Sequence, residues 1–281
     1  MIELFTRVGR RLCKIDPNDH FMQFPGGELH MKSDADMFTG DEIALIRGYV
    51  ETNDFIKLAM WSEVVRDQAG TSHAYIPYLP AARADKGVPL GGQIYADLIK
   101  IANVDYLVAT DVHSQKAVDF YSGFGLIDHP VDSIVAKHLI VNGHRHDAII
   151  APDKGAAARA RIFAEYMKLP VLQAEKVRDQ DTGELSGFSC PDAEEFGEGH
   201  FLIFDDICDG GGTFNGLADQ IMQKNQKATL DLFVTHGIFS KGGWELDRRF
   251  RNIFTTDTWS DYSTADGAVV IPVVQQVLKN I

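Results

Sequence analysis

The feature that most constrains this chain is residues 201–214, where an apolar run leads directly into acidic residues and then into glycines. The run Phe-Leu-Ile-Phe at 201–204, bounded by a turn signal, predicts a buried β-strand. Beyond it we expect a loop, and then a helix that begins near Phe214 with Thr213 as its cap. The acidic residues, glycines and cap are Asp205, Asp206, Asp209, Gly210, Gly211, Gly212 and Thr213.

This arrangement of residue types is suited to a sugar phosphate. Glycines between a strand and a helix N-terminus expose backbone N–H groups to an anion, and the helix dipole favours negative charge there. Carboxylates beside them suit the hydroxyls of a sugar diol or a divalent ion. The alternative is an ordinary strand-to-helix turn, which a lone glycine triplet would favour.

Composition limits the class of protein. With 281 residues, 45% hydrophobic and 24% charged, the chain is an ordinary globular protein of one large or two medium domains. The net charge of −13 argues against broad binding of nucleic acid, and no apolar run or leader pattern predicts a membrane segment. The three cysteines have no paired spacing, which predicts reduced thiols in a cytoplasmic protein and no structural zinc site.

The pattern of apolar residues alternates between strand and helix. We expect helices at 53–66, 93–102 and 156–167, and strands at 3–5, 29–31, 42–47, 74–78, 106–110, 138–141, 148–151, 171–174, 201–204 and 230–235. Such alternation implies an α/β fold of mostly parallel sheets covered by helices. The two halves have a similar order of elements, so we predict two similar domains, 1–131 and 132–268, with 269–281 returning to the first.

Two loops after predicted strands carry candidate metal-binding residues. Pro-Asp-Lys-Gly at 152–155 offers the Asp153 carboxylate to a metal and backbone N–H groups to a pyrophosphate. The alternative is that Asp153 only caps the following helix. Asp-Val-His at 111–113 places His113 where it could bind a metal or a phosphate, the alternative being a buried structural histidine.

Two further segments carry cations. Arg83 and Lys86 lie in a loop where they could hold a nucleotide triphosphate, or simply be solvated. Lys176 and Arg178 share one face if the chain there is extended, and two cations after a strand suit a phosphoryl group in transfer. A solvated basic edge is the alternative.

Together these segments resemble a known family. The 205–213 loop resembles the ribose-phosphate loop of the type I phosphoribosyltransferase fold, which usually has Thr where Gly210 stands. The full set, from about residue 24 to residue 240, follows the order and rough spacing of ribose-phosphate pyrophosphokinases. The matching motifs are Phe-x-x-Gly-Glu at 24–28, Ile-Pro-Tyr-x₄-Arg-x-Asp-Lys at 76–86, Asp-x-His at 111–113, Pro-Asp-x-Gly at 152–155, Lys-x-Arg at 176–178, Asp-Asp-x-x-Asp-x-Gly-Gly-Thr at 205–213 and Thr-His-x-x-Phe-Ser at 235–240.

The resemblance implies a reaction and roles for these residues. Magnesium-bound ATP would lie between the domains of a homo-oligomer, a dimer or a hexamer built from dimers. Its diphosphate would pass to the anomeric hydroxyl of ribose 5-phosphate. The implied ATP contacts are Phe24 and Glu28 of a neighbouring subunit, with Arg83, Asp85, Lys86 and His113. The implied metal-linked residues are His113 and Asp153, the ribose contacts Asp205 and Asp206, the 5-phosphate contacts Asp209, Gly210, Gly211, Gly212 and Thr213, and the catalytic cations Lys176 and Arg178.

Departures from the family pattern leave the acceptor open. Gly26 stands where Asp is usual, Ala84 where Gln is usual, and Gly210 where Thr is usual. The resemblance therefore leaves three functions: transfer to ribose 5-phosphate, transfer to a bulkier acceptor such as ADP-ribose, or non-catalytic regulation of true synthetases. The presence of Lys176, Arg178 and the acidic residues argues against the third.

Overall fold

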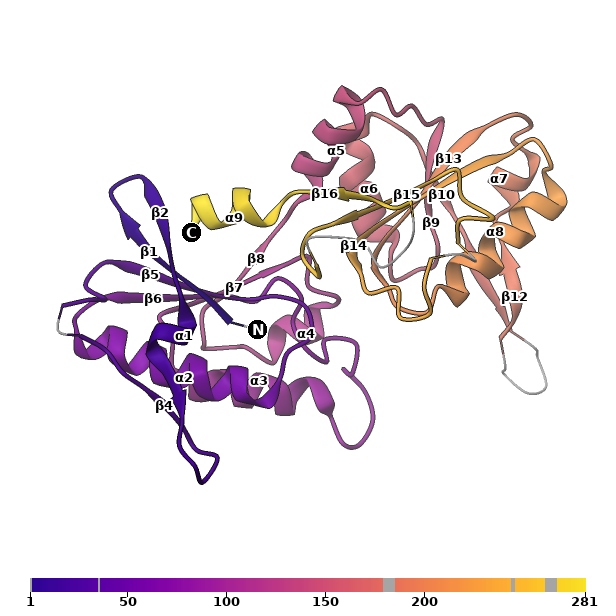
Figure 1. The fold of residues 1–281 in the computed structure, drawn as a ribbon. Helices are drawn as coiled ribbons and strands as arrows, with labels where there is room; N and C mark the ends of the chain where they lie inside the picture. The colour runs from indigo at the N-terminus through magenta and orange to yellow at the C-terminus, as the bar shows by residue number, and fades with distance from the viewer. Residues whose placement is uncertain (1, 35, 179–184, 244–245, 261–266) are drawn as a thin grey trace. The chain divides into compact units, whose positions relative to one another are not determined.

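The computed structural model describes residues 2–34, 36–178, 185–243, 246–260 and 267–281. The chain divides into two compact units, the first comprising Met1–His129 with Val274–Ile281 and the second Pro130–Val273. Each unit is built on a six-stranded sheet, drawn in indigo to magenta for the first unit and in magenta to yellow for the second (Figure 1).

The first unit combines a parallel core with an antiparallel edge. Its strand order is β2-β1-β5-β6-β7-β8, with β1 antiparallel to both neighbours and the pairs from β5 to β8 parallel. A separate hairpin, β3-β4, carries the turn at 24–28. The elements are β1 (Ile2–Val8), β2 (Arg11–Ile15), α1 (Pro17–His20), β3 (Phe21–Gln23), β4 (Leu29–Met31), β5 (Asp41–Ile46), α2 (Thr52–Asp67), β6 (Thr71–Tyr75), α3 (Gly91–Ile101), β7 (Tyr106–Thr110), α4 (Gln115–Asp119), β8 (Leu126–His129) and α9 (Val274–Asn280).

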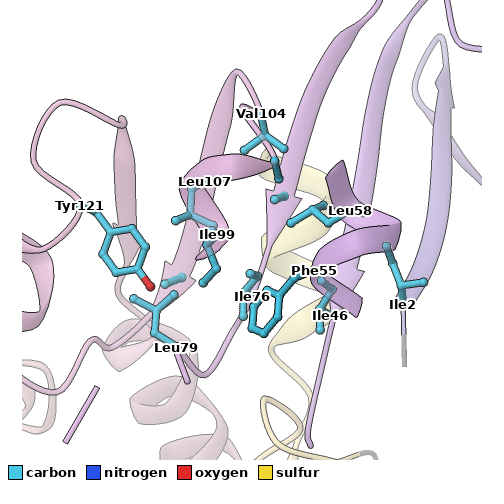
Figure 2. Packing of buried hydrophobic residues seen from close by; sticks show 14 of the residues in the cluster. Ile2, Ile46, Phe55, Leu58, Ile76, Leu79, Ile99, Val104, Leu107 and Tyr121 are labelled. Atoms are coloured by element: carbon cyan, nitrogen blue, oxygen red, sulfur yellow. The ribbon is translucent and has the colours of Figure 1, made fainter. Parts of the chain in front are cut away.

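Helix α2 shows why the first unit folds as it does. A capping box between Glu51 and Asp54 satisfies backbone donors at its N-terminus. Its buried side chains recur at helical spacing and include Leu58 and Trp61, both fully buried. Figure 2 shows Phe55 and Leu58 pointing towards strand residues such as Ile46 in the same apolar cluster. Burial of this face holds the helix on the sheet.

The second unit is a wholly parallel sheet of order β10-β9-β13-β14-β15-β16. On one face Phe163 of α6 stacks on Phe204 with ring centroids 4.1 Å apart, and Phe204 stacks on Phe233 at 4.9 Å. On the other face α8 buries Leu217 and Ile221. The elements are α5 (Asp132–Val141), β9 (Ala148–Ala151), α6 (Ala157–Met167), β10 (Val171–Gln173), β11 (Glu175–Arg178), β12 (Leu185–Ser189), α7 (Pro191–Glu195), β13 (His200–Cys208), α8 (Gly212–Lys224), β14 (Thr229–Gly237), β15 (Asn252–Thr256) and β16 (Val269–Ile271).

The predicted α/β class with two mostly parallel sheets is confirmed, one local prediction is wrong, and another holds only in part. Residues 138–141, expected as a strand, end helix α5, whose buried Val135, Ala136 and Leu139 follow helical spacing. The tail 269–281 does not return as a whole. Strand β16 extends the second sheet beside β15, and only the segment from Val274 joins the first unit, where Arg7 donates to the Leu278 and Ile281 carbonyl oxygens.

Candidate functional site

The candidate site of the second unit begins inside strand β13 rather than after it. The strand continues to Cys208 because residues through Cys208 pair in register with β14. Asp205 and Asp206 are therefore strand residues, whereas we had predicted that they lie in the loop. Asp206 is 2% exposed, and its backbone N–H donates to Asp205 Oδ1 at 2.9 Å. Two carboxylates are therefore held side by side near the carboxyl end of a parallel sheet, where α/β folds commonly bind ligands.

An arginine that the sequence analysis missed faces both carboxylates. Nη1 of Arg159, from helix α6, lies 3.8 Å from Asp205 Oδ1 and 3.6 Å from Asp206 Oδ1. The Arg159 side chain is 16% exposed, so this charge is largely shielded from water. In the sequence, the only feature that pointed to Arg159 was its position in the helix predicted after the 152–155 loop.

These neighbours set the ionisation of Asp205. Burial and the adjacent Asp206 carboxylate raise the pKa of Asp205 well above its ordinary value, while Arg159 opposes the rise. The pair therefore resists carrying two negative charges at once. A ligand that donates hydrogen bonds, such as a sugar diol, would favour the ionised form.

The glycine loop after β13 presents a helix N-terminus. Gly211 has a φ of +75°, a left-handed conformation that favours glycine, and it is the N-cap of α8, which begins at Gly212. Thr213 therefore lies inside the first turn and is not the cap that we predicted, because the glycine provides the turn without a side-chain hydrogen bond. The first N–H groups of α8 suit an anion at this place.

The neighbouring turn holds the loop in place. Ser240 donates from Oγ to Asp209 Oδ1, and its backbone N–H donates to the Asp209 carbonyl oxygen at 3.1 Å. A Cβ atom built at Gly210 would lie 3.3 Å from both Cδ and Cε of Lys241. The aliphatic stem of an exposed lysine thus borders the space that a larger residue at 210 would need.

Asp153 and Lys176, predicted for different roles, form one ion pair. Lys176 Nζ lies 2.6 Å from Asp153 Oδ2, and Asp153 Oδ1 accepts from the N–H groups of Gly155 and Ala156 at 2.9 and 3.1 Å. Burial would raise the pKa of Asp153, but the hydrogen bond from Lys176 and those from the two backbone N–H groups outweigh it and lower the pKa. A metal at Oδ2 would therefore have to displace the lysine.

Lys176 and Arg178 lie on β11, which pairs with β12 as a two-stranded hairpin. The segment is extended as predicted, with an irregular register between Val177 and Arg178, and a shared face of the two cations stays a prediction. The Lys176 side chain is 33% exposed, while the side chain of Arg178 lies outside what the structure describes.

The predicted nucleotide residues belong to the first unit. Phe24 and Glu28 flank the β3-β4 turn, where the Phe24 N–H donates to the Glu28 carbonyl oxygen at 2.8 Å. The Phe24 ring is 45% exposed and stacks on His30 with centroids 5.7 Å apart. Arg83 and Lys86 are exposed in the loop before α3.

Asp85 and His113 lie in two loops that contact each other. Ser114, next to His113, is the N-cap of α4 and also donates to Asp85 Oδ2 at 3.1 Å. Asp111 has a φ of +49°, so the segment before His113 turns sharply at the end of β7. Asp85 and His113 are thus in one loop system of the first unit, whereas Asp153 belongs to the second.

Comparison with known proteins agrees with this arrangement. The model of the family described as "Phosphoribosyl transferase domain" matches residues 128–247. A ribose-phosphate pyrophosphokinase of Maricaulis maris is 27% identical over 290 residues, covering 93% of this chain and 88% of the relative. One from Mycoplasma genitalium is 26% identical, covering 82% and 69%. The crystal structure of phosphoribosylpyrophosphate synthetase from Mycobacterium smegmatis is similar in fold, with a TM-score of 0.74 at 20% identity over 92% of this chain and 87% of that one.

The fold and the acidic-glycine loop define a protein with the phosphoribosyltransferase fold in its second unit. Over nearly the whole chain, the sequence is similar to ribose-phosphate pyrophosphokinases. Among the described residues, no helix combines the length and apolar character that crossing a bilayer requires.

Proposed function

We propose that this chain transfers the β,γ-diphosphate of ATP to the anomeric hydroxyl of ribose 5-phosphate, releasing AMP. The similarity to ribose-phosphate pyrophosphokinases supports a transferase of the diphosphokinase class. The observation that carries the choice of acceptor is the paired carboxylates Asp205 and Asp206 directly before a glycine loop and helix N-terminus. Such a site offers acceptors to a diol and donors to a phosphate.

The acceptor would be held at both ends. Asp205 and Asp206 would accept hydrogen bonds from the ribose hydroxyls, with Arg159 keeping the pair from losing its charge. The N–H groups of the 209–213 segment would bind the 5-phosphate. Held in this way, the anomeric hydroxyl is positioned for in-line attack at the β-phosphorus, and positioning accounts for much of catalysis in phosphoryl transfer.

The transferred group needs positive charge. Lys176 and Arg178 would stabilise the charge that spreads over the β-phosphoryl oxygens. Asp153 partners Lys176 at 2.6 Å, and we infer that the phosphates of a bound nucleotide take over this lysine. Release of Lys176 would leave Asp153 Oδ2 available at the same moment.

Mg²⁺ is the cofactor that we propose. It would supply charge neutralisation on the triphosphate, and it binds through one or two carboxylates, substrate phosphates and water. The freed Asp153 fits this ligand set. His113 fits it poorly, because imidazole suits softer ions, so we expect His113 to contact a phosphate instead.

The site of the nucleotide and the assembly are also proposals. Arg83, Asp85 and Lys86 would contact ATP, with Phe24 and Glu28 supplied by a neighbouring subunit of a cytoplasmic homo-oligomer. The exposed Phe24 ring on a hairpin turn supports such a contact. Size-exclusion chromatography with light scattering would test it, and a wild-type monomer at all concentrations would contradict it.

The central experiment is AMP release from Mg-ATP with ribose 5-phosphate, with the sugar product identified by mass. Asp206→Asn should abolish most turnover, because one acceptor for the diol is lost. Asp219→Asn is the matched control, since Asp219 lies on α8 and pairs with Arg249 on the surface. No acceptor-dependent AMP release by the folded wild type would sink the proposal.

ADP-ribose is the second candidate acceptor, and one observation favours it. Gly210 has no side chain, and the stem of Lys241 borders that space, so a flexible cation stands beside the phosphate loop. A 5-diphosphate carries more negative charge than a monophosphate and would gain more from it. The ratio of kcat/KM for the two acceptors decides between them. A tenfold preference for ADP-ribose, about 1.4 kcal/mol, would favour the second candidate.

Two variants test the physical reason. Lys241→Met should lower ADP-ribose use more than ribose 5-phosphate use, because it keeps the stem but removes the charge. Gly210→Thr should act in the same direction, since its Cβ and hydroxyl need the space beside Lys241. Equal loss on both acceptors would count against this role for the loop.

A further inference from the structure

Three side chains with metal-binding atoms meet at the other end of the second sheet. His146 precedes β9, His200 begins β13, and Asp231 lies near the start of β14. One ligand atom from each of the three lies within 4.8 Å of the others. The side chains of His146 and Asp231 are fully buried, and that of His200 is 22% exposed. We propose that this cluster binds one Zn²⁺ or a similar first-row divalent ion.

The contacts converge on one oxygen. Asp231 Oδ2 lies 2.9 Å from Nε2 of His146 and 3.0 Å from Nε2 of His200. In a tetrahedral zinc site with bonds of about 2.0 Å, neighbouring ligand atoms are about 3.3 Å apart. The two distances to Oδ2 fall a few tenths of an ångström short of that spacing, so a small outward movement of each imidazole from Oδ2 would match it. A water entering beside the partly exposed His200 would supply the fourth ligand.

The other oxygen of the carboxylate is already fixed. Asp231 Oδ1 accepts from both the backbone N–H and the side-chain Nδ2 of Asn252, each at 3.0 Å. Oδ2 is thereby turned towards the two imidazoles. A second layer of hydrogen bonds that orients a ligand is typical of protein metal sites.

The cluster is not satisfied by its own hydrogen bonds. Within the described structure, Nε2 of His200 is buried and lies 3.0 Å from Asp231 Oδ2 without the geometry of a hydrogen bond, and Nδ1 of His146 is buried without a hydrogen-bond partner. A neutral imidazole has one N–H and one lone pair, and leaving either buried and unpaired costs free energy. A cation held between Oδ2 and the two Nε2 atoms would accept the Nε2 lone pair of His200 and remove that part of the cost.

The charge of the cluster also favours a cation. An ionised carboxylate beside two imidazoles suits zinc, whereas magnesium prefers all-oxygen sites. The cysteine spacing gave no indication of this site, because its ligands are histidine and aspartate.

The site is separate from the proposed catalytic one. His200 and Cys208 are the two ends of β13, and a rise of about 3.3 Å per residue places them roughly 25 Å apart. A metal here would tie together the amino ends of three neighbouring strands, β9, β13 and β14. The ion is therefore structural, and neither proposal depends on the other.

The test uses the full chain, stripped with a chelator and kept in excess Mg²⁺ so that the triphosphate site is not left open to zinc. Titration with Zn²⁺ by calorimetry should give one ion per chain, and Tm should rise with Zn²⁺ because only the folded state binds it. His200→Gln should weaken Zn²⁺ binding at least ~100-fold. Loss of a residue that only orients a metal ligand costs about 10- to 100-fold in affinity, and loss of a ligand itself should cost no less. His138→Gln, on helix α5, and Asp153→Asn are the controls and should bind as the wild type does.

Three results would overturn the proposal: no zinc binding by the folded wild type, equal affinity in His200→Gln, or loss of binding in Asp153→Asn. If His200→Gln does not fold, Co²⁺ added to the wild type decides. Intense visible absorption of four-coordinate cobalt supports the site, and the weak spectrum of six-coordinate cobalt refutes it.

Discussion

Removal of the Arg159 charge should impair acceptor use in a way that depends on pH. Its guanidinium lies 3.8 and 3.6 Å from the two carboxylates that we assign to the ribose diol. In wild type it opposes the burial and the Asp206 charge that raise the pKa of Asp205. In Arg159→Gln that opposition is lost, so the pKa of Asp205 rises further and the carboxyl group protonates at a higher pH.

The size of the effect follows from what protonation removes. When Asp205 is protonated, its hydrogen bond from a ribose hydroxyl is no longer a bond to a charged group. A hydrogen bond to a charged group is worth about 1.5–3 kcal/mol. At about 1.4 kcal/mol per tenfold, kcat/KM should fall roughly 10- to 150-fold near neutral pH. The loss should shrink as pH rises, because Asp205 then ionises in the variant too. The Coulomb attraction of about 4.6 kcal/mol at 3.6 Å, for an effective dielectric constant near 20, is large enough to supply it.

The assay is kcat/KM for the acceptor across pH at saturating Mg-ATP, with the same substrates for every variant so that ionisation of the substrate cancels. Arg159→Lys keeps the positive charge and should shift the acid limb of the kcat/KM–pH profile less than Arg159→Gln does. Arg161→Gln, an exposed position two residues along the same helix, should match the wild type. An acid limb in Arg159→Gln that superimposes on the wild type, or a loss that is the same at every pH, would refute the reasoning.

Three further predictions follow from single contacts. Lys176→Ala should lower kcat at least ~100-fold while ribose phosphate still binds. Lys154→Ala, a change at a neighbouring exposed lysine, should leave kcat nearly unchanged. Near-normal AMP production by a folded Lys176→Ala variant would contradict the assignment. Turnover should stop in excess EDTA and return with Mg²⁺, and undiminished activity without metal would count against the proposed cofactor. Burial raises the pKa of Glu42, although the hydrogen bond from Thr6 opposes the rise. The contribution of Glu42 to stability is therefore full below its unfolded pKa of about 4.3 and is lost as pH rises through its folded pKa. The Tm of Glu42→Gln should accordingly increase relative to that of the wild type between pH 4 and pH 7, and a Tm difference that stays constant over this range would be evidence against this.

Much of the fold was predictable because its core strands are continuous apolar runs. The strands at 106–110 and 148–151 and the helix at 53–66 were predicted nearly to the residue, since each buries a complete face. Strand β2 was missed because Arg11–Ile15 is an exposed edge strand without alternation. The end of β13 was placed too early because aspartate is rare in strands, and pairing with β14 overrides that local preference.

The candidate site was predictable where residues adjacent in sequence are also adjacent in space. The segment with Asp205 and Asp206 and the loop with Asp209 needed only the rule that carboxyl ends of parallel strands meet at one edge. Arg159 was not predictable, because it reaches the carboxylates from a helix 46 positions earlier, and nothing local distinguishes it from Arg161. The pairing of Lys176 with Asp153 likewise depends on how β11 lies beside the 152–155 loop.

The second unit shows how one residue type acquires opposite properties at the two ends of a sheet. Both faces of the parallel sheet are covered by helices, so its polar groups gather at the strand ends. At the carboxyl end Asp205 meets another carboxylate, and its pKa is raised. At the amino end Asp231 meets two imidazoles and Asn252, and its pKa is lowered. The first arrangement holds charge that a donor-rich sugar can stabilise, and the second holds charge that attracts a cation. Neighbouring groups, more than burial alone, therefore decide which ligand each buried aspartate is suited to bind.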